Sequence, residues 1–165
     1  GACFPFRSGF DCGVNRMVFG NDGSMFVGMT NRGWGSIGRR PWGLQRLVYT
    51  GVLPFEIKEM RATPDGFELE FTKPVDPQVA NDAASYAMES YTYERWEKYG
   101  SPEIQRRALT IESADVAADG KTVRLVVSGL RPTFVHELTL INFTDEAGEE
   151  ILHDHHEQVF RSAAH

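Results

Sequence analysis

The sequence predicts an all-β protein: an antiparallel β-sandwich of about seven strands that follows a glycine-rich β segment. Short runs of alternating apolar and polar residues recur from residue 55 onward. Turn-forming residues separate these runs, as in Pro64-Asp65-Gly66 and Asp119-Gly120. Short strands divided by turns at intervals of about ten residues are typical of a sandwich, because each strand buries one face and runs antiparallel to its neighbour.

Composition limits the class of protein. Of the 165 residues, 41% are hydrophobic and 24% are charged, which provides enough apolar material for a core and argues against disorder. No apolar run approaches the roughly 20 residues that a membrane span needs, so no membrane span is expected. The net charge of −6 and the pI near 5.4 argue against a nucleic-acid partner, which requires a basic face.

The composition changes sharply near residue 51. Eleven of the 16 glycines lie in residues 1–51, where six arginines and two aspartates give a net charge of +4. Residues 52–165 carry a net charge of −10. A shift of this kind marks a domain junction, and Thr50–Pro54 is the natural place for it. We therefore predict two parts, residues 1–51 and residues 52–165.

The second part contains the clearest strand pattern. In Gly66–Thr72, apolar residues alternate with glutamates, and two prolines follow that cannot donate to a ladder. Asp76 is placed to cap a short helical turn through Ala80. The other expected strands are Phe55–Thr63, Ser85–Tyr93, Leu109–Val116, Thr122–Val127, Val135–Ile141 and a last strand near Val159-Phe160.

The inward faces of these strands predict the core. Apolar residues at every second position of a strand share one face of the sheet. A register shift of one residue would turn all of them toward the solvent. The predicted core consists of Ile57, Phe67, Leu69, Phe71, Tyr86, Ile111, Val123, Leu125, Val127, Leu138 and Leu140.

The first part predicts three strands and a Gly/Arg-rich loop at Thr30–Gly43. The strands are Asn15–Gly20 and Ser24–Met29, joined by an Asn-Asp-Gly turn, and Leu44–Tyr49. So few strands cannot form a core of their own. We therefore expect this segment to pack on the sandwich, with Trp34 or Trp42 at the contact.

Two cysteines, Cys3 and Cys12, lie near the N-terminus. Their spacing differs from C-x-x-C, which excludes a zinc ribbon, a thioredoxin motif or a covalent haem site. In an oxidising compartment the two thiols can form a disulfide, and in a reducing one they can be small core residues. The spacing permits both.

Four stretches resemble a known group of proteins. They read G-V-N-R-M-V-F-G-N-D-G-S-M-F-V-G (Gly13–Gly28), N-R-G-W-G (Asn31–Gly35), G-L-Q-R-L-V (Gly43–Val48) and P-F-E-I-K-E-M-R-A-T-P-D-G-F-E-L-E-F-T-K-P-V-D (Pro54–Asp76). They are similar to large secreted bacterial multidomain proteins with a β-propeller of the sorbosone and soluble glucose dehydrogenase type. The resemblance implies that residues 1–51 are the closing strands of a propeller. It also implies an immunoglobulin-like (Ig-like) sandwich in residues 52–165 and a secreted or periplasmic location.

The resemblance further implies partners and a cofactor for a longer protein. The partners are the rest of that chain, namely the propeller and a cytochrome c module, and the cofactor is a quinone of the PQQ type in the propeller. No cofactor is expected in the present chain alone. Arg16, Arg32, Arg39 and Arg40 are candidate ligand-binding residues, because guanidinium groups bind carboxylates of such a quinone in a forked geometry. Alternatively, these arginines pair with carboxylates of the acidic sandwich or face water.

An aromatic loop at Tyr91–Tyr99 interrupts the strand pattern. Tyr93, Trp96 and Tyr99 are candidates for binding a carbohydrate or docking a partner protein, because aromatic rings on a loop offer a stacking surface. The alternative, which we favour, is that the loop folds back and covers an open end of the sandwich.

A histidine cluster lies near the C-terminus. His153, His155 and His156 are candidate metal ligands, because imidazoles are good donors and the alternation of an extended chain places the first two on one side. The alternative is a solvated cluster without a metal.

No motif of a catalytic site is present. The sequence lacks a G-x-S-x-G elbow, a P-loop and an H-E-x-x-H motif. We therefore predict a non-catalytic structural or interaction module, an Ig-like domain that spaces a propeller from later domains. One alternative is a module that binds a carbohydrate or a partner through the aromatic loop. Another is a contribution of the arginines to a quinone-dependent sugar dehydrogenase site.

Overall fold

The computed structural model of the chain describes residues 2–3, 6–31 and 38–159, with the backbone alone for residue 2 and for residues 155–159. The chain divides into two compact units. One unit is Phe6–Leu53, and the other combines Gly1–Pro5 with Pro54–His165. The division lies two residues beyond the predicted junction. It also places β1 (Ala2–Cys3) with the later part of the chain, because β1 pairs with β11 (His155–Val159).

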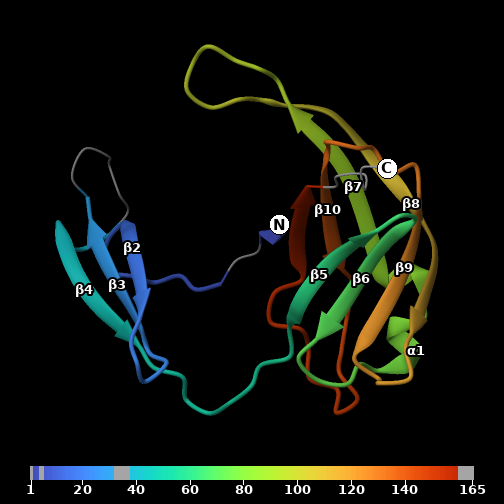
Figure 1. The fold of residues 1–165 in the computed structure, drawn as a ribbon, viewed down its shortest axis with the longest axis horizontal. Coiled ribbons are helices and arrows are strands. Elements are labelled where there is room, and N and C mark those ends of the chain that lie inside the picture. The colour runs from blue at the N-terminus through green and yellow to red at the C-terminus, as the bar shows by residue number, and fades with distance from the viewer. Residues whose placement is uncertain (1, 4–5, 32–37, 160–165) are drawn as a thin grey trace. The chain divides into compact units, whose positions relative to one another are not determined.

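The larger unit is an all-β sandwich, as the sequence predicts (Figure 1). Its eight strands follow the order β1-β11-β10-β7-β8-β9-β6-β5, and neighbouring strands are antiparallel. The strands not yet located are β5 (Ile57–Thr63), β6 (Gly66–Phe71), β7 (Tyr86–Tyr93), β8 (Glu103–Val116), β9 (Thr122–Ser128) and β10 (Val135–Leu140).

Strand β8 belongs to both layers of the sandwich. Its first half pairs with β7, and its second half, from Thr110 onward, pairs with β9. The register shifts between Ile111 and Ser113, and such a bulge bends a strand. A single hydrogen-bonded sheet therefore folds over at β8 to give two layers.

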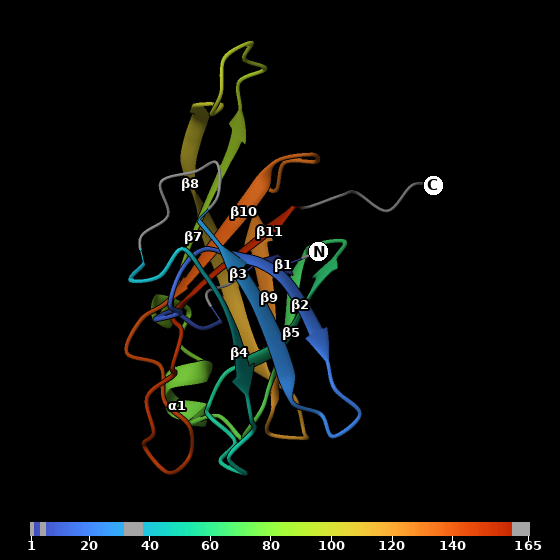
Figure 2. The same ribbon diagram turned by 90° about the vertical axis from the view of Figure 1, so that its left-hand side faces the viewer.

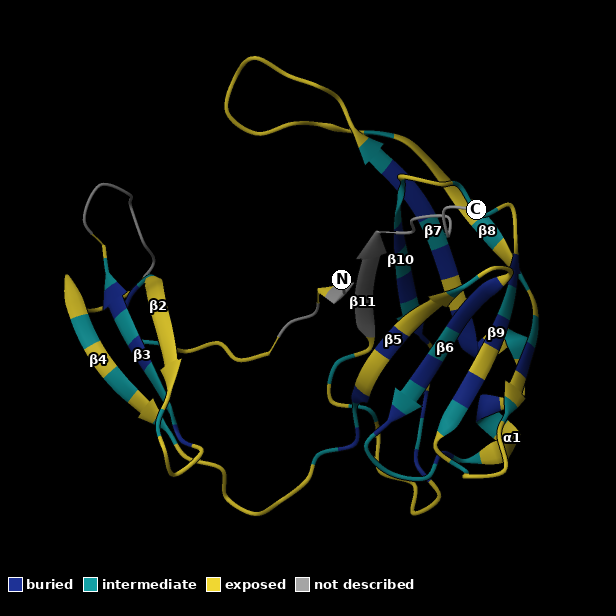
Figure 3. Ribbon diagram, viewed as in Figure 1, coloured by how far each residue is buried: buried dark blue, intermediate teal, exposed yellow. Residues whose placement is uncertain are grey.

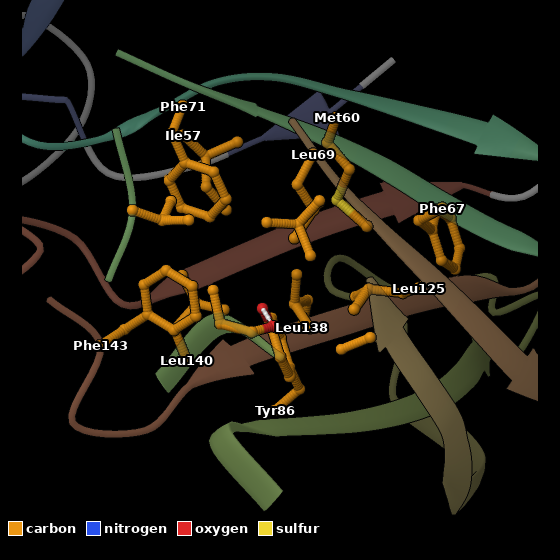
Figure 4. Close-up of a cluster of buried hydrophobic side chains, with 14 of the residues drawn as sticks. Ile57, Met60, Phe67, Leu69, Phe71, Tyr86, Leu125, Leu138, Leu140 and Phe143 are labelled. Carbon is orange, nitrogen blue, oxygen red and sulfur yellow. Dashed lines mark hydrogen bonds between the residues drawn. The ribbon is translucent and has the colours of Figure 1, made fainter. Parts of the chain in front are cut away.

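The apolar faces of the two layers meet in one core (Figures 3 and 4). All but one of the predicted core residues are buried, and Ile111 is half-buried against the others. Strict alternation from Ile57 would turn Glu59 inward, but a register shift after Ile57 turns Met60 inward instead. The buried residues of this core that the predicted set lacks are Phe55, Met60, Val75, Ala80, Met88, Ala114 and Phe143.

The short helix α1 (Pro77–Ala80) forms as predicted. The Asp76 side chain accepts a hydrogen bond of 2.8 Å from the backbone N–H of Gln78, which caps the first turn. A 3₁₀ turn follows at Ala83–Ser85. The hydroxyl of Tyr86 then donates to the carbonyl of Ala80 at 2.7 Å, so the helix end is fixed to the first residue of β7.

The smaller unit is a three-stranded antiparallel sheet in the order β2 (Val14–Phe19), β3 (Met25–Thr30), β4 (Trp42–Leu47). Strand β4 begins and ends two residues before the predicted strand. A small cluster of Cys12, Val27 and Met29 is buried on one face of β3. Cys3 and Cys12 are both free thiols. Trp34 and Arg32 lie outside the described residues.

Candidate functional site

The aromatic loop predicted at Tyr91–Tyr99 begins later in the structure, because residues 91–93 belong to β7. The loop itself, residues 94–102 between β7 and β8, projects beyond the sandwich (Figure 2). All its residues are exposed, so the expectation that it folds back over the sandwich is wrong. The cause lies in the two strands that carry it. Thr92 pairs with Ile104, and the N–H of Glu94 donates to the carbonyl of Pro102 at 3.0 Å. The ladder thus continues outward and holds the loop away from the core.

Three aromatic side chains lie on this hairpin. Trp96 is 45% exposed and Tyr99 is 91% exposed, while Tyr93 packs edge-on against Tyr91 with 5.5 Å between the ring centroids. The ammonium group of Lys98 lies 5.9 Å from the centroid of Trp96. The structure therefore exposes all three aromatic candidates on one hairpin, which also carries cationic and anionic side chains.

Arg106 anchors the base of the hairpin. Its guanidinium carbon lies 4.3 Å from the ring centroid of the buried Tyr91. The same group donates hydrogen bonds of 2.6 Å to carboxylates on three strands, those of Glu89, Glu103 and Glu137. These bonds raise the pKa of Arg106 further above its usual range. A register shift in β8 beside Tyr91, where Gln105 has a φ of 57°, accompanies this placement.

Arg131 forms a second polar cluster behind the hairpin. It donates to Ser90 Oγ and to the carbonyl of Gln105, both at 2.9 Å, and its guanidinium stacks 3.8 Å from the ring centroid of Phe134. The backbone N–H of Arg131 donates to His136 Nε2 at 3.4 Å. The sequence did not single out Arg106 or Arg131, because charged residues near strands usually face water.

His136 is fully buried, whereas the strand pattern alone did not predict its burial. Its Nδ1 lies 3.1 Å from the carbonyl of Phe134. Burial lowers the pKa of His136, and the charges of Arg131 and Arg107 lower it further. A neutral imidazole with the proton on Nδ1 satisfies both contacts, since Nδ1 donates and Nε2 accepts. His136 is therefore suited to a structural role in β10.

The histidine cluster is only partly described. His153 Nδ1 contacts Oε1 of Glu56, a carboxylate from the segment before β5. Burial raises the pKa of Glu56. His155 and His156 are consecutive residues of β11, where their backbones pair with β10, and their side chains lie outside the described residues. Among the described residues, no three metal-binding side chains gather within reach of one ion.

The described arginines of the smaller unit do not converge on one site. Arg16 Nη1 donates to the carbonyl of its neighbour Asn15 at 3.1 Å. Arg40 Nε lies 3.8 Å from a carboxylate oxygen of Asp11. Arg39 lines an open hollow of about 640 Å³ together with Gly9, Phe10, Asp11 and Gly38. Neither Arg16 nor Arg40 lines this hollow.

Comparison with known proteins identifies a similar fold. No protein-family model matches the chain, and no curated protein matches it. Solved structures of the bacterial S-layer protein SbsC do match: rSbsC(31-844), its domains 1-6 and its N-terminal part. Each is 20% identical with a TM-score of 0.52 and covers 68% of this chain. The chain spans 14% of the first two and 24% of the third, so the likeness concerns one part of those proteins and shows a shared fold. Among the described residues, no helix has the length and hydropathy to cross a membrane.

Proposed function

We propose that this chain is a non-catalytic structural module, an Ig-like domain of a larger secreted or periplasmic protein. The strand pairing supports the Ig-like assignment. One layer contains β5, β6, β9 and the second half of β8, and the other contains the first half of β8, β7, β10, β11 and β1. With β5 to β11 lettered A to G in chain order, the pairings β5-β6-β9-β8 and β7-β10-β11 correspond to A-B-E-D and C-F-G of Ig sandwiches, and the β7–β8 pairing is additional.

The observation that carries the proposal is that charged side chains on the outer faces of the sandwich form salt bridges with one another. On the outer face of β5 and β6, Arg61 contacts the carboxylates of Glu59, Glu68 and Glu70. Arg106 does the same on the outer face of the other layer. These charges bind one another across neighbouring strands and so join the strands laterally. The fold shared with an S-layer protein is consistent with a structural role.

A contribution of the arginines to a quinone site stays a proposal for the longer protein. The resemblance to sugar dehydrogenases implies a quinone in a complete propeller, yet Arg16, Arg39 and Arg40 do not face a common hollow. We therefore assign no catalytic step to these residues. Substituting Arg39→Ala and Arg40→Ala in the longer protein tests whether these arginines contribute to a quinone site there. Loss of quinone-dependent turnover would establish such a contribution.

A second candidate function rests on the aromatic loop. Its rings project from an anchored hairpin, and Tyr99 is almost fully exposed. Such rings can stack on the apolar face of a sugar, and the adjacent charged side chains can bind its hydroxyl groups. The candidate function is therefore carbohydrate or partner binding.

A glycan array probed with the full chain and with Trp96→Ala separates the two functions. A structural module gives no saturable binding to any glycan. Saturable binding that Trp96→Ala abolishes would establish the second function and overturn the first. Saturable binding that the variant retains would contradict both assignments, because it would place a binding site elsewhere on the chain.

A further inference from the structure

We infer that two copies of this chain pair edge to edge through β4 and form a symmetric dimer. Strand β4 lies at one edge of the three-stranded sheet, and in the described part of the chain it pairs with β3 alone. The outer edge of a strand offers unpaired N–H and C=O groups to another strand. Four properties of β4 favour a second copy of itself as the partner.

The first property is the set of backbone groups that face outward. The N–H of Asn31 donates to the carbonyl of Pro41 at 2.9 Å, and the register of β3 and β4 continues from there without a shift. Because bonded pairs alternate in an antiparallel ladder, Gly43 and Gln45 bond to β3. The residues that direct their N–H and C=O groups to the free edge are Trp42, Leu44 and Arg46.

The second property is the lack of protection along this edge. Proteins protect exposed edges with lysine, proline or a bulge, and β4 contains none of these. Its single charge, Arg46, is turned back to contact Asp22 and Ser24 of its own unit. The opposite edge is different, because β2 has a register shift before Arg16, whose side chain binds the carbonyl of Asn15.

The third property is apolar exposure beside the edge. Trp42 is 73% exposed and Leu44 is 71% exposed. Both lie on the same face of the sheet as Arg46, because they occupy alternate positions of one strand. Pairing two β4 strands would bury part of these side chains.

The fourth property is a register that complements itself. With a twofold axis at Leu44, this residue lies opposite the partner's Leu44, and Trp42 lies opposite the partner's Arg46. All three outward-facing residues then form hydrogen-bonded pairs, and the exposed Trp42 lies across from the partner's Arg46, whose guanidinium stays bound to Asp22 and Ser24 of its own unit. A shift by one residue would place outward-facing groups opposite inward-facing ones and lose these bonds.

The twofold arrangement closes the assembly at two copies. Both chains use the same strand, so the paired edges are no longer available. The contact involves one strand of each copy and is small, and small interfaces are typical of weak complexes. We therefore expect a concentration-dependent equilibrium between monomer and dimer.

Sedimentation equilibrium of the full chain tests this inference from micromolar to millimolar concentration. The average mass should rise from 18.5 kDa toward twice that value. Leu44→Lys should abolish the rise, because two lysines would meet at the axis. Val18→Lys is the matched control. Val18 is 64% exposed and lies on the same face of the sheet as Leu44, but in β2 at the opposite edge. This variant should dimerise as the unmodified chain does, and circular dichroism confirms that both variants remain folded.

Three results would overturn the proposal. They are a monomer at every concentration, an equal effect of the two lysine substitutions, and masses that increase beyond the dimer. The last result would indicate an open-ended contact between different surfaces.

Cross-linking identifies the register independently. In a Cys3→Ser background, Leu44→Cys should form a disulfide-linked dimer on mild oxidation, because a hydrogen-bonded pair has a Cα separation of about 5.5 Å that suits a disulfide. Cys12 is buried and is left in place. Val18→Cys in the same background should remain monomeric. Equal cross-linking of the two variants would refute pairing through β4.

Discussion

Leu125→Ala tests whether the strand faces of the sandwich are assigned correctly. Leu125 lies fully buried in β9, opposite Phe67 in β6 and Ala114 in β8. The substitution removes the equivalent of about three methylene groups, at about 0.8 kcal/mol each. A further loss comes from the cavity, whose size depends on how far the surroundings collapse.

Collapse around Leu125 is limited by a close backbone contact. A Cβ atom at Gly66 would lie only 1.8 Å from the carbonyl oxygen of Leu125. The backbones of β6 and β9 therefore cannot move closer together at this point. The cavity should therefore remain largely open. We expect the free energy of unfolding to fall by about 3–5 kcal/mol, measured by urea denaturation at neutral pH.

Arg124→Ala is the matched control for Leu125→Ala. Arg124 precedes Leu125 and points outward, where its guanidinium binds Asp65 at 2.8 Å. An exposed pair of this kind contributes little to stability, because solvent screens it. A loss below about 0.5 kcal/mol for Leu125→Ala, or a larger loss for Arg124→Ala, would refute the assignment of the inward face.

Three further predictions concern other parts of the sandwich. Gly66→Ala should destabilise the fold by about 3 kcal/mol or more, because its Cβ overlaps the Leu125 carbonyl; soluble expression and urea denaturation check this. The pKa of His136 is lowered in the folded state from its ordinary value of 6.5. Below about pH 6.5 the unfolded chain therefore binds more protons than the folded chain, and the free energy of unfolding falls as the pH drops from 6.5 through the folded-state pKa. His136→Asn should remove this pH dependence from urea titrations, and an unchanged slope would contradict it. Trp96→Ala should change the free energy of unfolding by less than about 0.5 kcal/mol, since the projecting loop does not contribute to the core; a larger loss in thermal or urea unfolding would show that Trp96 packs on the sandwich.

Much of the sandwich follows from alternation in the sequence. Strands β6 and β9 lie where the pattern predicts them, because both alternate cleanly and both pair with a strand on each side. In β5 the alternation fails at one point, since a bulge after Ile57 turns Met60 inward. A bulge depends on the register with the neighbouring strand, and the local composition does not reveal it.

The first half of β8 could not be predicted for a related reason. The run Gln105-Arg106-Arg107 is typical of a loop, yet it belongs to a strand that begins at Glu103. Arg106 is stabilised there by glutamates on β7 and β10. These partners come together only in the folded sheet, so the sequence contains no local sign of them.

In the candidate sites, too, local sequence predicts some features, whereas others depend on contacts made only in the folded sheet. The position of the aromatic loop is predictable, because it lies between two strands, but its projection depends on how far the β7–β8 ladder continues. The contact of His153 with Glu56 joins residues 97 positions apart, and no spacing rule predicts it. The packing of the Gly/Arg-rich segment on the sandwich stays a prediction, which limited proteolysis within residues 38–51 tests.

The sharing of β8 affects how the sandwich unfolds. In a sandwich with two separate sheets, one sheet can lose its ladder while the other keeps its own. Here the strand that borders β7 is also the strand that borders β9, so release of β8 breaks hydrogen bonds in both layers at once. Amide hydrogens of β7 and β9 should therefore exchange with the same opening free energy, as members of one cooperative unit. The bulge at Ile111–Ser113 is the point at which β8 passes from one layer to the other, so a distortion of one layer is transmitted to the other there.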